Sequence, residues 1–217
     1  MASKEKKEIL KSIYFPALLL MLMWLVKSTE LIFEVKLSIL GVYPLKLKGL
    51  IGILFSPLVH SDFGHLMANS VSFFILCSCL FYFYKRIAYP SFFLIYFLSG
   101  FWLWFIGRAS YHIGASGIIY GLASFLFISG LIRRNPPLMA ITLVITFLYG
   151  SMIWGVFPDF FQEKNISWEG HLTGLVAGIV LAVYYRKSGP KPKEYEWDNE
   201  DEEEDENAYW NNVKPSN

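Results

Sequence analysis

Three short segments of the sequence carry side chains that together could perform acyl transfer. Residues 114–117 read Gly-Ala-Ser-Gly and offer a hydroxyl, and residues 170–171 read Gly-His and offer an imidazole. A serine hydroxyl is a weak nucleophile at its ordinary pKa and needs an adjacent base, which makes His171 the candidate base for Ser116. The third segment, residues 60–69, adds two imidazoles and a carboxamide. These residue types favour nucleophilic attack on a carbonyl carbon.

The same segments supply hydrogen-bond donors for the oxyanion that such an attack creates. The backbone N–H of Ser116 at a helix start, the Asn69 amide and a ring N–H of His65 could bind it together. Tyr120 lies four residues after Ser116, so a helix presents both on one face, and its ring could orient the His171 imidazole. No acidic residue is expected beside either candidate within a span, which predicts a Ser–His dyad and not a triad.

Glycines recur at intervals of four around both candidates. Small residues at this spacing allow two helices to approach closely in lipid, and a contact between Ser116 and His171 requires such an approach. We expect the site to be supported by Gly114, Gly117 and His60, and the helices to pack through Gly121, Gly170, Gly174 and Gly178.

Composition indicates that these segments belong to a membrane protein. Of the 217 residues, 54% are hydrophobic and 17% are charged, whereas a soluble domain usually carries about 25% charged residues. A bilayer-crossing helix needs about 20 mainly apolar residues. Six segments come near this length, at about 12–33, 66–84, 90–106, 116–132, 137–157 and 171–185. The sequence therefore predicts an all-α membrane protein, a bundle of six transmembrane helices.

The distribution of charge predicts the orientation of this bundle. Lys and Arg hold short loops in the cytoplasm, and with the N-terminus inside, twelve of them fall on the inner side and five on the outer side. The second, fourth and sixth spans then run inward, so their first residues share the outer side. Both termini are expected in the cytoplasm, with the site toward the outer side.

The chain outside the spans divides into a basic start and an acidic end. Residues 1–11 form a basic cytoplasmic N-terminus; a signal peptide is the alternative, but no small-residue cleavage motif follows the first apolar run. Residues 12–187 would form one catalytic domain. Ten of the 18 acidic residues lie in residues 194–206, which predicts a disordered, acidic cytoplasmic tail over residues 188–217.

A zinc site is the alternative use of the histidines. His60, His65 and His171 could be three imidazole ligands. The first two are five residues apart, whereas the His-Glu-x-x-His motif places its ligands four apart and adds a glutamate base. We therefore expect no metal and no cofactor. His112 has no partner at helical spacing, and we assign it no role.

The three segments resemble the signature motifs of the rhomboid family of intramembrane serine proteases, in its compact six-span bacterial type. They occur in the family's order and on the second, fourth and sixth predicted spans. The matching residues are His60, His65, Asn69, Gly114, Ser116, Gly117, Tyr120, Gly170, His171, Gly174 and Gly178. The resemblance covers about residues 12–187.

The resemblance implies a function. Rhomboids cleave transmembrane segments of other membrane proteins near their outer end, without a cofactor. The expected partners are therefore transmembrane substrates and the lipid bilayer, with no nucleic acid, and the expected location is the bacterial inner membrane. By motif match, Ser116 would be the nucleophile and His171 the general base, while His65, Asn69 and the Ser116 N–H would form the oxyanion hole.

The resemblance also bears on the outer surface. Trp154 and Phe157, with a cap loop over residues 159–169, would form the substrate gate. Residues 35–60 form a long outer connection whose apolar run 50–55 is too short to cross, so we expect this loop to lie in the membrane interface. Many rhomboids have a Trp-Arg pair in this loop that is absent here, so its shape must rest on other bonds.

Two other functions are open at this stage, and the oligomeric state is not indicated. A catalytically silent rhomboid-like protein would bind or chaperone transmembrane clients. A small transporter would need charged residues deep in several spans, and the sequence has few.

Overall fold

The computed structural model describes residues 2–148, 157 and 166–189, and this part of the chain is helical, with no β-strand in it. The long helices are α1 (Ala2–Ile32), α3 (Phe63–Phe83), α4 (Ala88–Ile106), α5 (Ser116–Ile132), α6 (Pro136–Leu148) and α8 (Trp168–Tyr184). Short helical turns between α1 and α3 are η1 (Leu37–Leu40), η2 (Leu47–Gly49), α2 (Gly52–Phe55) and η3 (Ser56–Leu58). The predicted all-α fold is confirmed.

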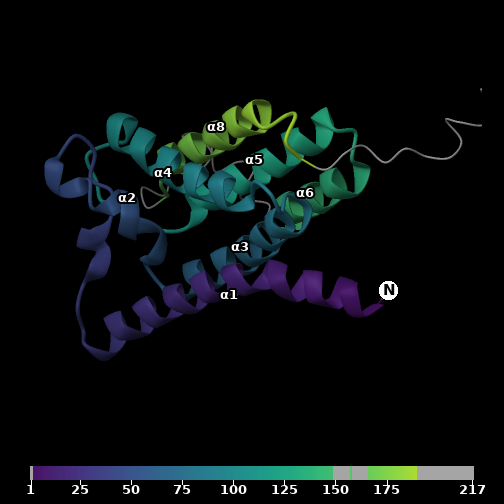
Figure 1. Cartoon of the computed structure of the whole chain (residues 1–217). Helices are drawn as coiled ribbons and strands as arrows, with labels where there is room; N and C mark the ends of the chain where they lie inside the picture. The colour runs from purple at the N-terminus through teal and green to yellow at the C-terminus, as the bar shows by residue number, and fades with distance from the viewer. Residues whose placement is uncertain (1, 149–156, 158–165, 190–217) are drawn as a thin grey trace, which may run out of the picture.

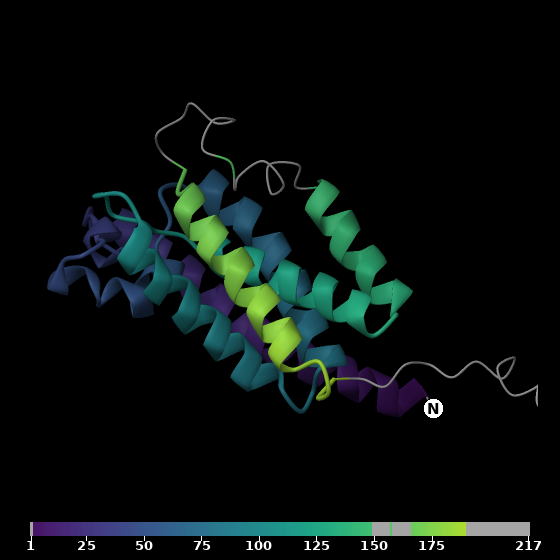
Figure 2. The same ribbon diagram turned by 90° about the horizontal axis from the view of Figure 1, so that it is seen from above.

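Packing brings distant parts of the chain together around α5. In Figure 1, α1 lies beneath α3, and α8 lies alongside α5 above them. Figure 2 shows α6 on the other side of the bundle from α4. α5 contacts α3, α4, α6 and α8. The helix that begins with Ser116 is therefore the centre of the bundle, and its first residue is held by neighbours on several sides.

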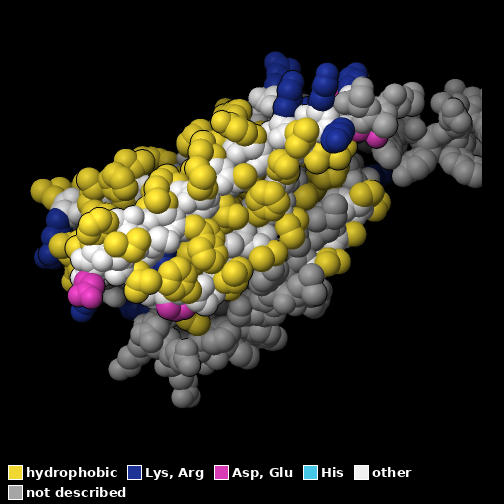
Figure 3. Space-filling view, turned by 90° about the horizontal axis from the view of Figure 1, so that it is seen from below, with side chains coloured by type: hydrophobic (Ala, Val, Ile, Leu, Met, Phe, Trp, Pro, Cys, Tyr) yellow, Lys and Arg dark blue, Asp and Glu magenta, His cyan; other side chains and the backbone are white. Residues whose placement is uncertain are grey.

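Among the described residues, three helices are long and apolar enough to cross a membrane, over Lys4–Ile32, Phe63–Phe83 and Ala88–Ile106. α5 and α8 are apolar helices of 17 residues each. The predicted span at 137–157 is described as helix from Pro136 to Leu148. In Figure 3, hydrophobic side chains cover the middle of one face, while Lys and Arg gather toward its ends. The chain is a membrane protein, and the count of six spans stays a prediction.

The first helix differs from the prediction at its start. α1 begins at Ala2, about ten residues before the expected start of the span, because Lys and Glu are good helix formers and Glu5 lies in the first turn. The basic N-terminus thus continues directly into the first span. Near the other end of α1, Lys27 donates to Glu30 at 2.7 Å and to the carbonyl oxygens of His60 at 3.1 Å and Ser61 at 2.9 Å.

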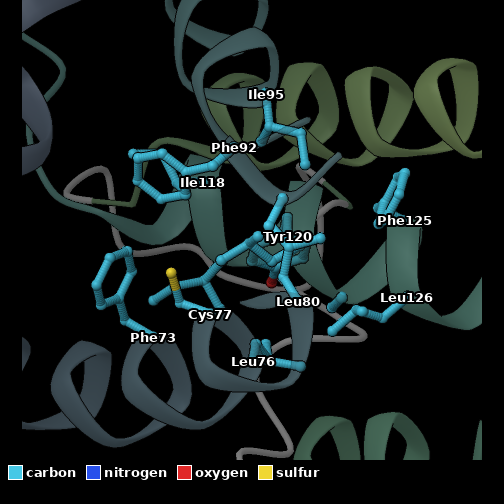
Figure 4. Close-up of a cluster of buried hydrophobic side chains, with 14 of the residues drawn as sticks. Phe73, Leu76, Cys77, Leu80, Phe92, Ile95, Ile118, Tyr120, Phe125 and Leu126 are labelled. Atoms are coloured by element: carbon cyan, nitrogen blue, oxygen red, sulfur yellow. The ribbon is translucent and has the colours of Figure 1, made fainter. Parts of the chain in front are cut away.

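The core beneath the site is built from α3, α4 and α5. Phe73 and Leu80 of α3, Ile95 of α4 and Phe125 of α5 are fully buried and pack in one cluster, which Figure 4 shows with Tyr120 among its members. Cys77 belongs to the same cluster as a free thiol. This packing sets the relative height at which α3 and α5 begin, and so the level of the side chains in their first turns.

The loop between α1 and α3, predicted to be the first outer loop, is held by bonds to α4 in the absence of the Trp-Arg pair. Trp104 Nε1 donates to the Lys46 carbonyl at 3.0 Å, the Trp104 carbonyl accepts from Leu45 N at 3.0 Å, and the Tyr96 hydroxyl donates to the Leu54 carbonyl. The loop exposes large apolar side chains, among them Leu45, Leu47, Ile51 and Leu54. Such exposure suits the membrane interface predicted for this loop.

Candidate active site

The side chains of Ser116 and His171 meet at the start of two helices. The Oγ atom of Ser116 lies 2.9 Å from Nε2 of His171. Ser116 is the first residue of α5, and His171 lies in the first turn of α8, with 9% of its surface exposed. The pairing joins residues 55 apart in sequence. A hydroxyl and a largely buried imidazole in hydrogen-bonding contact form the arrangement from which a serine nucleophile is generated.

The Tyr120 ring stacks on the imidazole. Its centroid lies 4.3 Å from that of His171, and the two ring planes differ by 11°. Tyr120 is one helical turn below Ser116 on α5, so the residue that donates the hydroxyl and the residue that supports the base come from the same helix face. The stack restricts rotation of the imidazole ring.

The two helices approach through glycines at several levels. A Cβ added at Gly174 would lie 1.9 Å from the carbonyl oxygen of Gly117, and one at Gly178 would lie 2.1 Å from that of Gly121. Gly170 is different, because its added Cβ would meet Ser167 Oγ at 2.9 Å and so points away from α5. The Ser116–His171 contact therefore depends on backbone approach that a side chain at 174 or 178 would prevent.

Gly114 shapes the loop that leads to Ser116. Its φ angle is +107°, which L side chains rarely adopt, and an added Cβ would lie 2.9 Å from Cε1 of His65 and 3.7 Å from Nδ2 of Asn69. Its N–H donates to the Ser56 carbonyl at 2.9 Å. The glycine allows both side chains of α3 to come against the backbone two residues before Ser116.

The amide nitrogen of Asn69 is available for a ligand. Asn69 is 8% exposed, and its buried Nδ2 has no hydrogen-bond partner within the part of the chain that the structure describes. A buried donor without a partner is costly to the fold and is common at sites where a ligand provides the acceptor. The first N–H groups of α5 also lack acceptors within their own helix. Donors from α3 and α5 thus converge near Ser116.

His65 and Ser61 form a second polar pair at the start of α3. Nδ1 of His65 lies 3.1 Å from Ser61 Oγ, which also lies 2.7 Å from Asp62 Oδ2. The carboxylate of Asp62 caps α3 by accepting from His65 N at 2.8 Å. The Ser61 hydroxyl donates its one proton to Asp62 Oδ2, so a neutral His65 could donate from Nε2 only if that proton turned from Asp62 to Nδ1 of His65.

His60 supports the loop from below. It is 1% exposed, and its Nε2 accepts from the N–H of Ala115 at 3.4 Å, while its ring lies edge-on to that of His65 with centroids 5.1 Å apart. Burial, and next the charge of His65, lowers the pKa of His60 to about 4. His60 is therefore neutral at physiological pH and serves as an acceptor for the residue before Ser116.

The remaining predictions concern the substrate gate, the acidic tail and a metal site. Phe157 is 51% exposed, and Trp154 and the acidic tail lie outside the described residues. No three His, Cys, Asp or Glu side chains lie close enough to hold a metal ion within residues 2–148, 157 and 166–189. His60, His65 and His171 accordingly do not form a three-ligand cluster.

The prediction that His112 has no partner was wrong. It is 3% exposed, its Nδ1 lies 2.6 Å from Ser167 Oγ, and its Nε2 lies 3.0 Å from the Arg108 carbonyl oxygen. The expectation of no acidic residue near the dyad was also incomplete, because Glu169, two residues before His171, is 2% exposed and binds Arg108. The sequence signal for Glu169 was an acid directly before a Gly-His pair in an apolar helix.

Comparisons with known proteins agree with the geometry. Residues 48–188 match the family model of the Rhomboid domain. The chain is 37% identical over 183 residues to an uncharacterized protein of Mycobacterium tuberculosis (strain ATCC 25618 / H37Rv), covering 79% of this chain and 73% of that protein. It is 31% identical over 139 residues to a Bacillus subtilis (strain 168) protein named "Putative rhomboid protease", covering 58% of this chain and 62% of the relative. The chain therefore belongs to the rhomboid family.

Proposed function

We propose that the protein is an intramembrane serine endopeptidase that cleaves transmembrane segments of other membrane proteins near their outer end. The observation that carries this proposal is the 2.9 Å contact between Ser116 Oγ and His171 Nε2, at the start of two helices of a rhomboid domain. The site would face the outer side of a bacterial inner membrane with both termini in the cytoplasm. Trp154 and Phe157 would form the gate through which a substrate enters from the bilayer.

The first chemical step would use the dyad directly. In the His171 tautomer that carries its proton on Nδ1, the Ser116 hydroxyl donates to Nε2, which would take the proton as Oγ attacks the carbonyl carbon. The Tyr120 ring holds the imidazole plane in line for this transfer. Collapse of the tetrahedral intermediate returns the proton from Nε2 to the leaving amine, and water then attacks the acyl-enzyme by the reverse route.

The oxyanion would be bound by donors from two helices. The Ser116 N–H lies at the start of α5, and the Asn69 amide nitrogen is buried without a partner in the described chain. His65 would add an N–H from Nε2 once the Ser61 hydroxyl turned from Asp62 to donate to Nδ1 of His65. Donors already fixed around the charge that develops in the transition state are usually the largest single contribution to catalysis of this type.

The test is cleavage of a reporter transmembrane segment by purified protein in proteoliposomes. Ser116→Ala should abolish cleavage, and a fluorophosphonate probe should label the wild type but not this variant. Ser124→Ala is the matched control, because Ser124 lies on the same helix two turns below and bonds to the Leu175 carbonyl at 2.9 Å. The control should cleave at the wild-type rate.

Unchanged cleavage by Ser116→Ala would refute the proposal. Capture of reporter segments by the wild type, without product and without fluorophosphonate labelling, would instead favour a client-binding member of the family.

A further inference from the structure

The segments that lead into Ser116 and His171 are bonded to each other. His112 lies four residues before Ser116, and Ser167 lies four residues before His171. The 2.6 Å contact between His112 Nδ1 and Ser167 Oγ therefore joins a second histidine and serine four residues upstream of the dyad, and both pairs are 55 residues apart in sequence. Neither His112 nor Ser167 contacts the reacting atoms in these bonds.

The partners of His112 decide where its protons lie. Nε2 is 3.0 Å from the Arg108 carbonyl oxygen, which can only accept, so Nε2 carries the proton. In the neutral ring Nδ1 is then an acceptor, and the Ser167 hydroxyl donates to it. The Ser167 oxygen in turn accepts from Gly170 N at 3.2 Å and so caps α8. Burial lowers the pKa of His112, which favours this neutral form.

A charged pair runs beside this hydrogen-bonded chain. Nη1 of Arg108 lies 3.2 and 3.0 Å from the two carboxylate oxygens of Glu169, and the backbone N–H of Arg108 lies 3.3 Å from one of them. Nη2 of Arg108 donates to the Ile166 carbonyl at 2.7 Å. A carboxylate as buried as that of Glu169 is stable only with such a partner. The first turn of α8 is thus fixed by a second set of bonds.

The other end of these bonds is anchored in the first outer loop. The N–H and carbonyl of His112 exchange hydrogen bonds with those of Val42, both at 2.9 Å. Val42 is fully buried. The backbone of His112 is therefore held by Val42, and the bond from His112 to Ser167 ties the start of α8 to this loop.

From these contacts we propose that Arg108, His112, Ser167 and Glu169 form a clasp that positions His171 for proton transfer with Ser116. The four are positioning residues, and none is proposed to touch the substrate. The inference rests on the proposed protease function. Since a displacement of about 1 Å at a reacting group can cost about 100-fold in rate, loosening the clasp should lower kcat with little effect on substrate binding.

The first experiment compares Ser167→Ala with Ser167→Thr. The alanine variant loses the cap and the bond to His112, whereas threonine retains the hydroxyl. With active sites counted by fluorophosphonate labelling, Ser167→Ala should lower kcat per active site by about 10-fold or more and change KM by less than about 2-fold. Ser167→Thr should restore most of the rate. Ser124→Ala, which removes another hydroxyl between α5 and α8, should leave both parameters unchanged.

A second experiment separates the two ring nitrogens of His112. An asparagine amide can replace Nδ1 as the acceptor for Ser167, while a glutamine amide can replace Nε2 as the donor to the Arg108 carbonyl. We expect His112→Asn to retain more of the wild-type kcat than His112→Gln, and His112→Phe to retain the least. Glu169→Gln should lower kcat as well, with labelled protein recovered in detergent at the wild-type yield.

Two results would overturn the clasp while leaving the protease function standing. One is a kcat for Ser167→Ala and His112→Phe within about 2-fold of wild type in samples where Ser116→Ala is inactive. The other is a loss of labelled active sites in both variants with normal kcat in the remainder, which would mean that these bonds stabilise the fold only. Wild-type protein that neither cleaves nor labels would instead refute the protease function itself.

Discussion

The two halves of the candidate site are held in different ways. The dyad half is built on α5 and α8, whose backbones touch at Gly117 and Gly174 and whose first turns are bonded through the clasp. The oxyanion half depends on His65 and Asn69 of α3, which lie against the loop at Gly114, and this loop is bonded to the segment before α3 through Ser56 and His60. A side chain added between the backbones of α5 and α8 must move one helix, whereas the loss of Asn69 removes a single donor.

This difference predicts how each half fails. Side chains added between the backbones of α5 and α8 should disturb stability and activity together, since close-packed backbone cannot adjust locally. Loss of the Asn69 amide should lower activity and leave stability nearly unchanged, because its Nδ2 has no partner to lose among the described residues. The predictions below begin with the largest expected effect.

Gly174→Ala would break the contact between α5 and α8. Its Cβ would lie 1.9 Å from the Gly117 carbonyl oxygen and 2.7 Å from the Gly117 carbonyl carbon, so one helix must move. We expect a destabilisation of about 1–3 kcal/mol and a loss of about 100-fold or more in kcat, measured by thermal unfolding in detergent and by reporter cleavage. Gly130→Ala is the control, because the nearest contact of its Cβ is the flexible side chain of Met139, at 3.0 Å, and backbone comes no closer than 3.5 Å. Equal behaviour of the two variants would contradict the backbone contact.

Asn69→Ala would test the oxyanion half alone. Loss of one oxyanion donor costs about 100- to 1,000-fold in kcat, and because Asn69 Nδ2 has no partner in the described structure, the thermal midpoint should change little. Ser72→Ala, one turn further along α3, is the control and should retain full activity. A large drop in the thermal midpoint of Asn69→Ala would show that the amide is structural.

Tyr120 can sharpen the comparison within the dyad half. Tyr120→Phe keeps the ring that stacks on His171, while Tyr120→Leu removes it. Because a stacked pair contributes about 0.5–1.5 kcal/mol, we expect kcat of the leucine variant to fall by about 3- to 10-fold relative to the phenylalanine variant. Steady-state cleavage at saturating substrate gives kcat for both variants. A kcat ratio near one would show that the Tyr120 ring does not orient His171.

The effect expected of His60 at neutral pH is the smallest, because it appears only in the pH dependence of stability below pH 6.5. Its pKa in the folded protein is about 4, below the ordinary value of 6.5, so between these pH values the unfolded state binds a proton that the folded state does not. The resulting stability is present above pH 6.5 and is lost as pH falls toward 4, by about 1.4 kcal/mol per pH unit. Thermal midpoints of His60→Gln should therefore fall less steeply over this window than those of the wild type. Parallel curves would contradict a neutral, buried His60.

Sequence patterns were sufficient where the functional residues are spaced by local helix geometry. Ser116 and Tyr120 are one turn apart on α5, and polar groups at the start of apolar helices are conspicuous, so these residues and the helices carrying them could be predicted. The geometry of the dyad followed from the parallel direction of α5 and α8.

The clasp could not be predicted in this way. His112 reaches Ser167 only because the loop before α5 pairs with Val42, and no periodicity signals a loop conformation. Arg108 and Glu169 are 61 residues apart, and no sequence spacing predicts an ion pair between residues that far apart. The helical start of α1 was not predicted because its charged residues were interpreted as a non-helical tail, although Lys and Glu favour a helix.

The two pairs that join the starts of α5 and α8 are both 55 residues apart in sequence, and this equal spacing restricts where the chain can change in length. His112 pairs with Ser167, Ser116 with His171, and Gly121 fits between the levels of Gly174 and Gly178. One residue inserted between Ser116 and Gly121, or between His171 and Gly174, would turn the residues beyond it by about 100° and shift them by about 1.5 Å, so the dyad and the glycine contacts could not both form. Residues added to the connection between the two helices would leave all of these partners matched. Length variation among homologues should therefore be confined to that connection.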